Sequence, residues 1–217
     1  MIGHGGHTVG ATNMDGDISV YAGLDLLVTG GDATRDFAQI GHGGVDANGD
    51  LSGDIDVVVG RSLFVNGGSA GNSYGMIGHG SAQPSSAGAR SGSIDLSVEN
   101  GTTVADNATS ARLGHGTTAV ASVSNSAFNL TTGTLDTTGS VEGVTGIIDV
   151  MAPGGHVEFV VTGGDLDVDG PGAFFTSGFD VDLVATGHVN LAASVSNGGA
   201  GAVNIAAGWD GATGLTR

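Results

Sequence analysis

The stretch GDIDVVVG, at residues 53–60, has the pattern of a short β-strand bounded by glycines. Successive side chains of an extended chain point to opposite sides, so Ile55, Val57 and Val59 share one face. Asp56 falls on the opposite face. The stretch therefore predicts a strand with one apolar, buried face and one polar, solvated face.

The same phrase recurs on either side of this strand as part of a longer repeat. A second apolar run follows the phrase, and the motif I/L-G-H-G then supplies a third strand. The first phrase also occurs as GDISVYAG (16–23) and GSIDLSVE (92–99), the second run as LDLLVTGG (24–31) and SLFVNGG (62–68), and the motif at 1–5, 39–43, 76–80 and 112–116. One three-strand unit of about 37 residues is therefore copied along the chain.

After residue 125 the I/L-G-H-G motif stops, but the strand phrase continues at intervals as short as about 20 residues. We therefore expect a coil of about 20 residues that a loop enlarges to about 37 in the first half. The predicted fold is all-β, a parallel β-helix or β-solenoid of roughly seven coils. It forms a single segment over 1–217, with I/L-G-H-G repeats over 1–124 and degenerate, shorter coils over 125–217.

The composition excludes several classes of partner. Five Lys and Arg residues against 22 Asp and Glu residues give a formal net charge of −17, so no nucleic acid partner is expected. No apolar run is long enough to span a bilayer, so no membrane insertion is expected either. The chain lacks cysteine, which excludes disulfides and thiolate metal sites.

The two ends of the chain resemble the interior of a repeat. Met1 aligns with Gln39, Met76 and Arg112, and the last stretch, at 208–217, has no pattern of a capping helix. We therefore expect an uncapped fragment of a longer repetitive protein. Exposed strand edges at its ends predict end-to-end self-association.

Two stretches carry a resemblance to a known family. They are FAQIGHGG (37–44), followed by a polar loop and SGDIDVVVG (52–60), and the long run DVDLVATGHVNLAASVSNGGAGAVNIAAGWDG (180–211). Together with the repeats between them, they resemble the repeat regions of filamentous-haemagglutinin-like large bacterial exoproteins, which are exported by two-partner or autotransporter-type secretion.

This resemblance implies a right-handed parallel β-helix that forms the stalk of an adhesin. It also implies a protein that is secreted or held at the bacterial cell surface. The expected partners are a receptor or glycan on a host or neighbouring cell and an outer-membrane secretion partner for the parent protein.

The histidines of the motif are the first candidate site. His4, His42, His79 and His115 lie 38, 37 and 36 residues apart, and each shares the inward side with the Ile or Leu two residues earlier. Stacked coils would place the rings in a ladder about 5 Å apart. We expect neutral, structural imidazoles, and the alternative is a transition-metal site for zinc or nickel formed by His42, His79 and His115.

A column of polar residues on the outward side is the second candidate. Each follows an inward aliphatic or aromatic residue, and the aligned positions are Ser19, Asp56, Asp95, Asn129, Asp149 and Asp182. Water and salt can screen the repulsion between the carboxylates of such a column, so it needs no bound ion. The alternative is a calcium-binding solenoid that uses Asp56 and Asp95. The stretch DANGDLSGD (46–54) only partly matches a calcium loop. No cofactor is required.

The alternative enzymatic class is a β-helical polysaccharide lyase or hydrolase, which uses clustered carboxylates on the same scaffold. Aspartates recur at equivalent positions in successive coils, whereas a single active site would interrupt the pattern at one place. The sequence has no nucleophile elbow, phosphate loop or His-Glu-x-x-His motif. We therefore expect no enzyme, and the role that the sequence predicts is a structural and interaction segment of an adhesin.

Overall fold

The computed structural model contains the whole chain and is all-β, and no helix occurs in the part of the chain described below. That part also includes no helix with the length and hydropathy needed to cross a bilayer. The description covers residues 1–217 except 8–9, 11, 82–87, 106–108, 110, 116–121, 125–127, 139–147, 153–156, 163, 169–172, 178–179, 193, 199 and 210–217. Most of the terminal stretch in which the sequence predicts no capping helix thus lies outside the described residues.

In the first part of the chain, the strands recur in the same order along successive repeats. The first repeat contains β1 (Met14–Asp15), β2 (Ile18–Ala22), β3 (Leu26–Thr29) and β4 (Phe37–Ile40). The second contains β5 (Leu51–Ser52), β6 (Ile55–Val59), β7 (Ser62–Asn66) and β8 (Tyr74–Ile77). They are followed by β9 (Ala89–Ser91), β10 (Ile94–Ala105) and β11 (Ala111–Leu113).

The strands of the second half are spaced less evenly. They are β12 (Ser122–Ser124), β13 (Phe128–Thr138), β14 (Ile148–Ala152), β15 (Val157–Val161), β16 (Leu166–Val168), β17 (Ala173–Ser177), β18 (Val181–Ala185), β19 (Val189–Leu191), β20 (Val195–Asn197) and β21 (Val203–Ala207).

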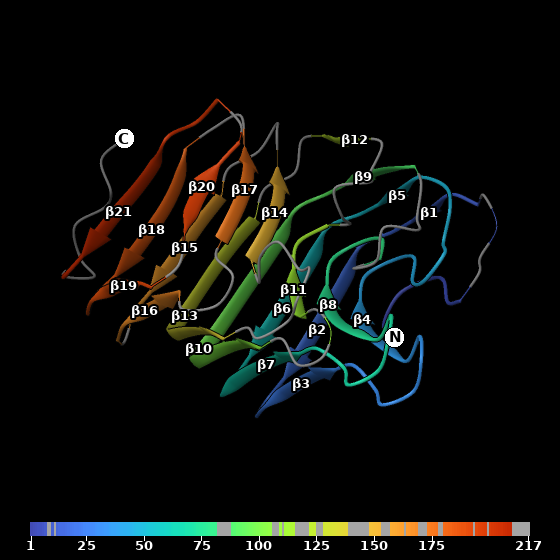
Figure 1. Cartoon of the computed structure of the whole chain (residues 1–217), viewed down its shortest axis with the longest axis horizontal. Helices are drawn as coiled ribbons and strands as arrows, with labels where there is room; N and C mark the ends of the chain where they lie inside the picture. The colour runs from blue at the N-terminus through green and yellow to red at the C-terminus, as the bar shows by residue number, and fades with distance from the viewer. Residues whose placement is uncertain are drawn as a thin grey trace.

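Every pairing between these strands is parallel and joins equivalent segments. The long sheet runs β2-β6-β10-β13-β15-β18-β21, and Figure 1 shows these strands side by side from the blue to the red end of the chain. Ile55 is paired with Ile18 on one side and with Ile94 on the other. A second sheet runs β20-β17-β14-β11-β8-β4, and the predicted parallel, repeat-on-repeat pairing is confirmed.

The core lies on the face that the sequence alternation predicts. Ile55, Val57 and Val59 are fully buried, whereas Asp56 between them is exposed. The third repeat shows the same alternation. Aliphatic side chains from successive strands therefore stack in one continuous core, so each repeat is stabilised chiefly by its neighbours.

The long loops of the first repeats contain paired strands that the sequence analysis does not predict. Short strands within them pair in a sheet of their own, in the order β1-β5-β9-β12. In the second half, fewer residues separate successive strands of the long sheet. Val157 pairs with Val181, and Val181 pairs with Val203. The repeats of the first half therefore differ from the shorter ones by an extra strand, which pairs with the extra strand of the next repeat.

One position assigned to the outward polar column is wrong. Asp149 lies in β14 and pairs with Phe174 in the second sheet. The residue in register with Asn129 and Asp182 is Glu158, in β15. The error arises because the spacing of the strands becomes irregular after residue 125, so counting along the sequence no longer identifies the residue that pairs.

Candidate functional site

The histidines of the I/L-G-H-G motif form a stacked column through the first part of the protein. The ring centroids of His4 and His42 are 5.0 Å apart, those of His42 and His79 are 4.9 Å apart, and those of His79 and His115 are 4.8 Å apart. The rings are within 8° of parallel. His42, His79 and His115 are buried, whereas His4 at the edge is exposed. The predicted ladder and its spacing are confirmed.

Each of the three buried rings is fixed by two hydrogen bonds to the backbone. The backbone N–H of His42 donates to Nδ1 of His79, and that of His79 donates to Nδ1 of His115, both at 3.0 Å. The Nε2 atoms of His42 and His79 lie 2.8 Å from the carbonyl oxygens of Gly16 and Gly53. Because Nδ1 accepts from an N–H and Nε2 faces a carbonyl, this network assigns the neutral tautomer with the proton on Nε2.

The glycine before each histidine makes this close approach of repeats feasible. Gly41 has φ +147° and Gly78 has φ +149°, a backbone region that residues with a side chain rarely adopt. A Cβ on Gly41 would lie 1.9 Å from the carbonyl oxygen of Gly78. The Gly-His pair is therefore a single structural element, because the glycine lets the next backbone approach and the histidine bonds to it.

Burial holds the rings of His79 and His115 in the neutral state. Desolvation is the main cause that lowers the pKa of His79 to about 3, and the neighbouring His115 lowers it further. Desolvation also lowers the pKa of His115 to about 4. Arg90 contributes in the same direction at both rings, while hydrogen bonds to Gly53 and Gly92 act in the opposite direction. His79 and His115 are thus uncharged at neutral pH.

The buried rings of this arrangement offer a metal ion no ready ligand. A ring nitrogen binds a metal through its lone pair, and in His42 and His79 both the Nδ1 lone pair and the Nε2 proton are already engaged with the backbone. Within the described residues, no group of three or more His, Cys, Asp or Glu side chains is arranged to hold an ion. A transition metal would have to displace hydrogen bonds that join two repeats.

Next to the ladder, a buried glutamine satisfies backbone carbonyls of two repeats. Nε2 of Gln39 donates to the carbonyls of Gly78 and Gly80, both at 2.8 Å, and to that of His42 at 3.2 Å. The hydroxyl of Tyr74 donates to Oε1 of Gln39 at 3.4 Å. Burial raises the pKa of Tyr74, so the phenol stays protonated and remains a donor.

Aspartates before the strands form a second set of contacts between repeats, which the sequence analysis did not identify. Oδ1 of Asp17 accepts from the backbone N–H of Asp54 at 3.0 Å, and Oδ1 of Asp54 accepts from that of Ser93 at 2.8 Å. In both cases the acceptor belongs to the earlier repeat, and the donor is the equivalent residue of the next one. The same contact joins Asn13 to Asp50, Asp50 to Ala89, Asp165 to His188 and Asp180 to Ala202.

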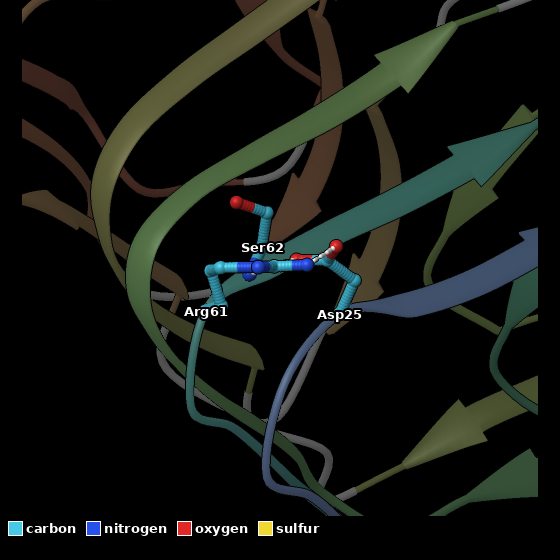
Figure 2. A network of polar contacts seen from close by, with 3 residues as sticks. All are labelled: Asp25, Arg61 and Ser62. Atoms are coloured by element: carbon cyan, nitrogen blue, oxygen red, sulfur yellow. Dashed lines mark hydrogen bonds and ion pairs between the residues drawn. The ribbon is translucent and has the colours of Figure 1, made fainter.

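An ion pair adds to this set, between the turn that joins β2 to β3 and the turn that joins β6 to β7. Figure 2 shows the guanidinium of Arg61 facing the carboxylate of Asp25, and Nε of Arg61 donates to Oδ1 at 2.6 Å. The N–H of Ser62 donates to the same Oδ1 at 3.2 Å. The hydrogen bond from Arg61 is the main cause that lowers the pKa of Asp25. This exposed pair therefore links two repeats.

The two calcium candidates lie next to each other on the outward face. Asp56 and Asp95 are exposed and directly paired in register, with Ser19 on the far side of Asp56. Farther along the column, Asp182 is buried, and Nδ2 of Asn204 donates to its Oδ1 at 2.8 Å. The predicted adjacency of Asp56 and Asp95 is confirmed, but this pair supplies only two carboxylates, whereas calcium takes six to eight oxygen ligands.

Two buried arginines were also missed by the sequence analysis. Arg90 is fully buried in register with Leu51, and its Nη1 donates to the carbonyls of Gly49 and Ala89 at 2.8 and 2.9 Å. Arg112 occupies the position of Met76 in the next repeat and is also buried. The sequence did contain an indication that both arginines are buried. Each aligns with an apolar residue of the neighbouring repeat, Arg90 with Leu51 and Arg112 with Met76.

Comparison with known proteins assigns no family to the chain. No family model, curated protein or solved structure matches it. The filamentous-haemagglutinin resemblance is therefore an expectation from the sequence phrases alone, and the function has to be argued from the geometry of the repeats.

Proposed function

We propose that this chain is a non-enzymatic stalk segment of a secreted or surface-exposed bacterial adhesin. In this proposal the parallel strands wind into a right-handed β-helix of roughly seven coils, which provides reach and a display surface. Its partners are a receptor or glycan on a host or neighbouring cell, and the parent protein is exported through an outer-membrane secretion partner.

One observation carries the proposal: polar side chains that could do chemistry are used to join repeats. The rings of His42 and His79 bond to the backbone of adjacent repeats, and the carboxylates of Asp17 and Asp54 do the same. A catalytic site needs such groups to converge on one point, whereas here they are distributed along the stack. This distribution supports a scaffold rather than an active site.

The charge of −17 also suits a solvated, extended surface. Mutual repulsion between copies keeps such a protein soluble and discourages contact with nucleic acids and anionic lipids. Recognition of a neutral glycan or of a basic protein surface is compatible with this charge. The proposal therefore requires neither a cofactor nor a bound metal ion.

The test compares cell-surface binding with polysaccharide cleavage. Labelled chain is incubated with cultured animal cells, with bacterial cells and with a glycan array, and saturable binding at one of these surfaces is the expected result. Samples of acidic polysaccharides incubated with the chain are assayed for new reducing ends, and none are expected. Release of such ends, lost when surface carboxylates are replaced, would establish the lyase or hydrolase instead.

A further inference from the structure

Five apolar side chains lie on the outside of the first two repeats, around the turns that join β2 to β3 and β6 to β7. We call this surface the apolar corner, and it consists of Tyr21, Leu24, Leu27, Val58 and Phe64. Tyr21 is 79% exposed, Leu24 and Leu27 are each 65% exposed, and Val58 is 36% exposed. The side chain of Phe64 is partly exposed.

Strand pairing brings these side chains together. Tyr21 pairs with Val58 and Leu27 pairs with Phe64, so the two members of each pair lie on neighbouring strands about 5 Å apart. Leu24 lies in the turn between β2 and β3. In the third repeat, β10 runs without a break along both β6 and β7, so the outward faces on the two sides of the turn form one curved surface. A contiguous apolar surface of this kind, unlike a single exposed side chain, marks a place of interaction.

The alternation of side chains directs the apolar corner away from the core. In β6, Val58 lies between the buried residues Val57 and Val59, and in β7 Phe64 also lies between two buried residues. The second repeat has a paired repeat on each side. Exposure of Val58 and Phe64 is therefore a property of the outward face and not of an end of the stack.

The apolar corner ends at the third repeat. There Ser97 pairs with Val58, and Thr103 pairs with Phe64. The inward positions of β10 that pair with β6 are still aliphatic. Parallel stacking thus proceeds with polar residues at these outward positions, so the fold does not require the apolar ones.

Carboxylates border the apolar corner. Asp56 lies two residues before Val58 on the same outward face, and it pairs with Asp95 of the third repeat. Both aspartates are exposed, and two like charges at this spacing repel each other. The guanidinium of Arg61, at the turn between β6 and β7, donates to Asp25. A cation from a partner would relieve the repulsion between the paired aspartates.

We propose that the apolar corner is the docking surface for a protein segment that presents apolar side chains flanked by Lys or Arg. The apolar side chains of this segment pack on Tyr21, Leu27 and Phe64, and its cations pair with Asp56 and Asp95. The inference rests on the proposed function, because it assigns the chemistry of the surface receptor. A buried apolar centre with charges at its rim is the usual anatomy of such an interface.

Two other occupants fit this surface less well. A second copy of the chain would bring a formal net charge of −17 and the same carboxylates against the first copy, which opposes association. A neutral glycan would stack on the ring of Tyr21, but its hydroxyl groups would lose water against Leu24, Leu27 and Val58 without gaining hydrogen bonds. Burial of apolar area together with charge pairing therefore favours a basic protein segment.

The test measures binding of a synthetic amphipathic peptide of Leu and Lys to the full chain by titration calorimetry. Two comparison peptides replace every Leu by Ser or every Lys by Glu, and only the Leu–Lys peptide should bind saturably. Tyr21→Ser with Leu27→Ser should weaken its binding at least about tenfold, because apolar contact area is lost while the charge is kept. Asp56→Asn with Asp95→Asn should weaken binding and reduce its dependence on salt. The control Leu191→Ser, at an exposed leucine in β19, should leave binding unchanged.

A second measurement uses the unmodified chain, so that it does not depend on the folding of a variant. The methyl signals of Leu27 and Val58 in nuclear magnetic resonance spectra should shift when the Leu–Lys peptide is added, and those of Leu191 should not. Equal binding of the Ser–Lys peptide, or shifts that avoid the apolar corner, would overturn the proposal, because charge alone would then hold the peptide.

Further outcomes separate this inference from its alternatives and from the proposed function. Glycan-array binding that is lost in the variant with Tyr21→Ser and Leu27→Ser would overturn the proposal in favour of a glycan. Dimer formation that is lost in the same variant would overturn it in favour of a second copy. Cell-surface binding that persists in this variant would leave adhesion standing and overturn the apolar corner as its receptor site. Peptide binding at the apolar corner without any cell-surface binding would support the docking surface and reject adhesion.

Discussion

The backbone N–H of His42 donates to Nδ1 of His79, 3.0 Å away in the next repeat, while the two rings stack 4.9 Å apart. The protonation state of one ring is thereby tied to the pairing of two backbones. A proton on Nδ1 would replace an acceptor by a donor and oppose the incoming N–H. Stability of the stack is therefore coupled to pH through the ladder.

The pH dependence follows from the lowered pKa values of His79 and His115, about 3 and about 4, against an ordinary value of 6.5. At pH values between the lowered pKa of each ring and 6.5, the unfolded chain binds more protons than the folded chain. Stability from the two rings is therefore complete above about pH 6.5 and is lost as pH falls toward 4, by about 1.4 kcal/mol per pH unit for each ring. Chemical denaturation at pH 7, 6, 5 and 4 measures this slope. A slope unchanged in H79Q would contradict the assignment.

Replacing one ring of the ladder should destabilise the protein without any involvement of metal. His79→Ala leaves the N–H of His42 without its acceptor and the carbonyl of Gly53 without its donor, so we expect a loss of about 2–4 kcal/mol. Thermal melts of the parent and of the variant, each with and without a chelator, measure the effect. If the chelator alone lowers the Tm of the parent as far as the mutation does, and zinc or nickel restores it, the ladder binds metal.

The glycine before the histidine should tolerate substitution even less well. Gly41→Ala places a Cβ against the carbonyl of Gly78 in a backbone region unfavourable for alanine, so we expect a loss of at least about 3 kcal/mol or failure to fold. Gly71→Ala is the control, because no atom lies within 4 Å of its Cβ position. Equal stability of the two variants in denaturant titrations would show that repeats do not approach as closely as described.

The aspartates before the strands should act as hydrogen-bond acceptors rather than as charges. Asp54→Ala removes the acceptor for the N–H of Ser93 and should cost about 1 kcal/mol, whereas Asp54→Asn retains an oxygen and should cost less. Asp56→Ala, on the exposed outward face, is the comparison and should have little effect on stability. A loss in Asp54→Asn as large as that in Asp54→Ala would assign the effect to charge.

Calcium should interact with the outward face only as a screening ion. Asp56 and Asp95 are paired and exposed, so divalent cations reduce their repulsion without a defined coordination shell. Calcium and magnesium at equal concentration are therefore expected to raise Tm by the same small amount. Saturable calcium binding in calorimetry, abolished by D56N and D95N together, would instead establish a calcium site.

Much of the structure of the first half could be predicted from sequence, because it depends on the alternation of side chains within a strand and on the equal spacing of the repeats. Alternation in a strand places Ile55 inward and Asp56 outward whatever the rest of the chain does. Equal spacing then brings His42 and His79 to equivalent positions, and the strand separation sets their distance. The adjacency of Asp56 and Asp95 follows in the same way.

Other features were decided only by tertiary structure. Irregular intervals after residue 125 shift the register, so that Glu158 and not Asp149 pairs with Asn129 and Asp182. The carboxylate of Asp54 reaches the N–H of Ser93 because the next repeat lies on that side, and nothing in the local sequence says which side this is. Arg90 is buried since neighbouring loops pair around it and supply carbonyls to its guanidinium. Periodicity is encoded along the chain, whereas register, direction of stacking and burial of a charge depend on contacts between residues distant in sequence.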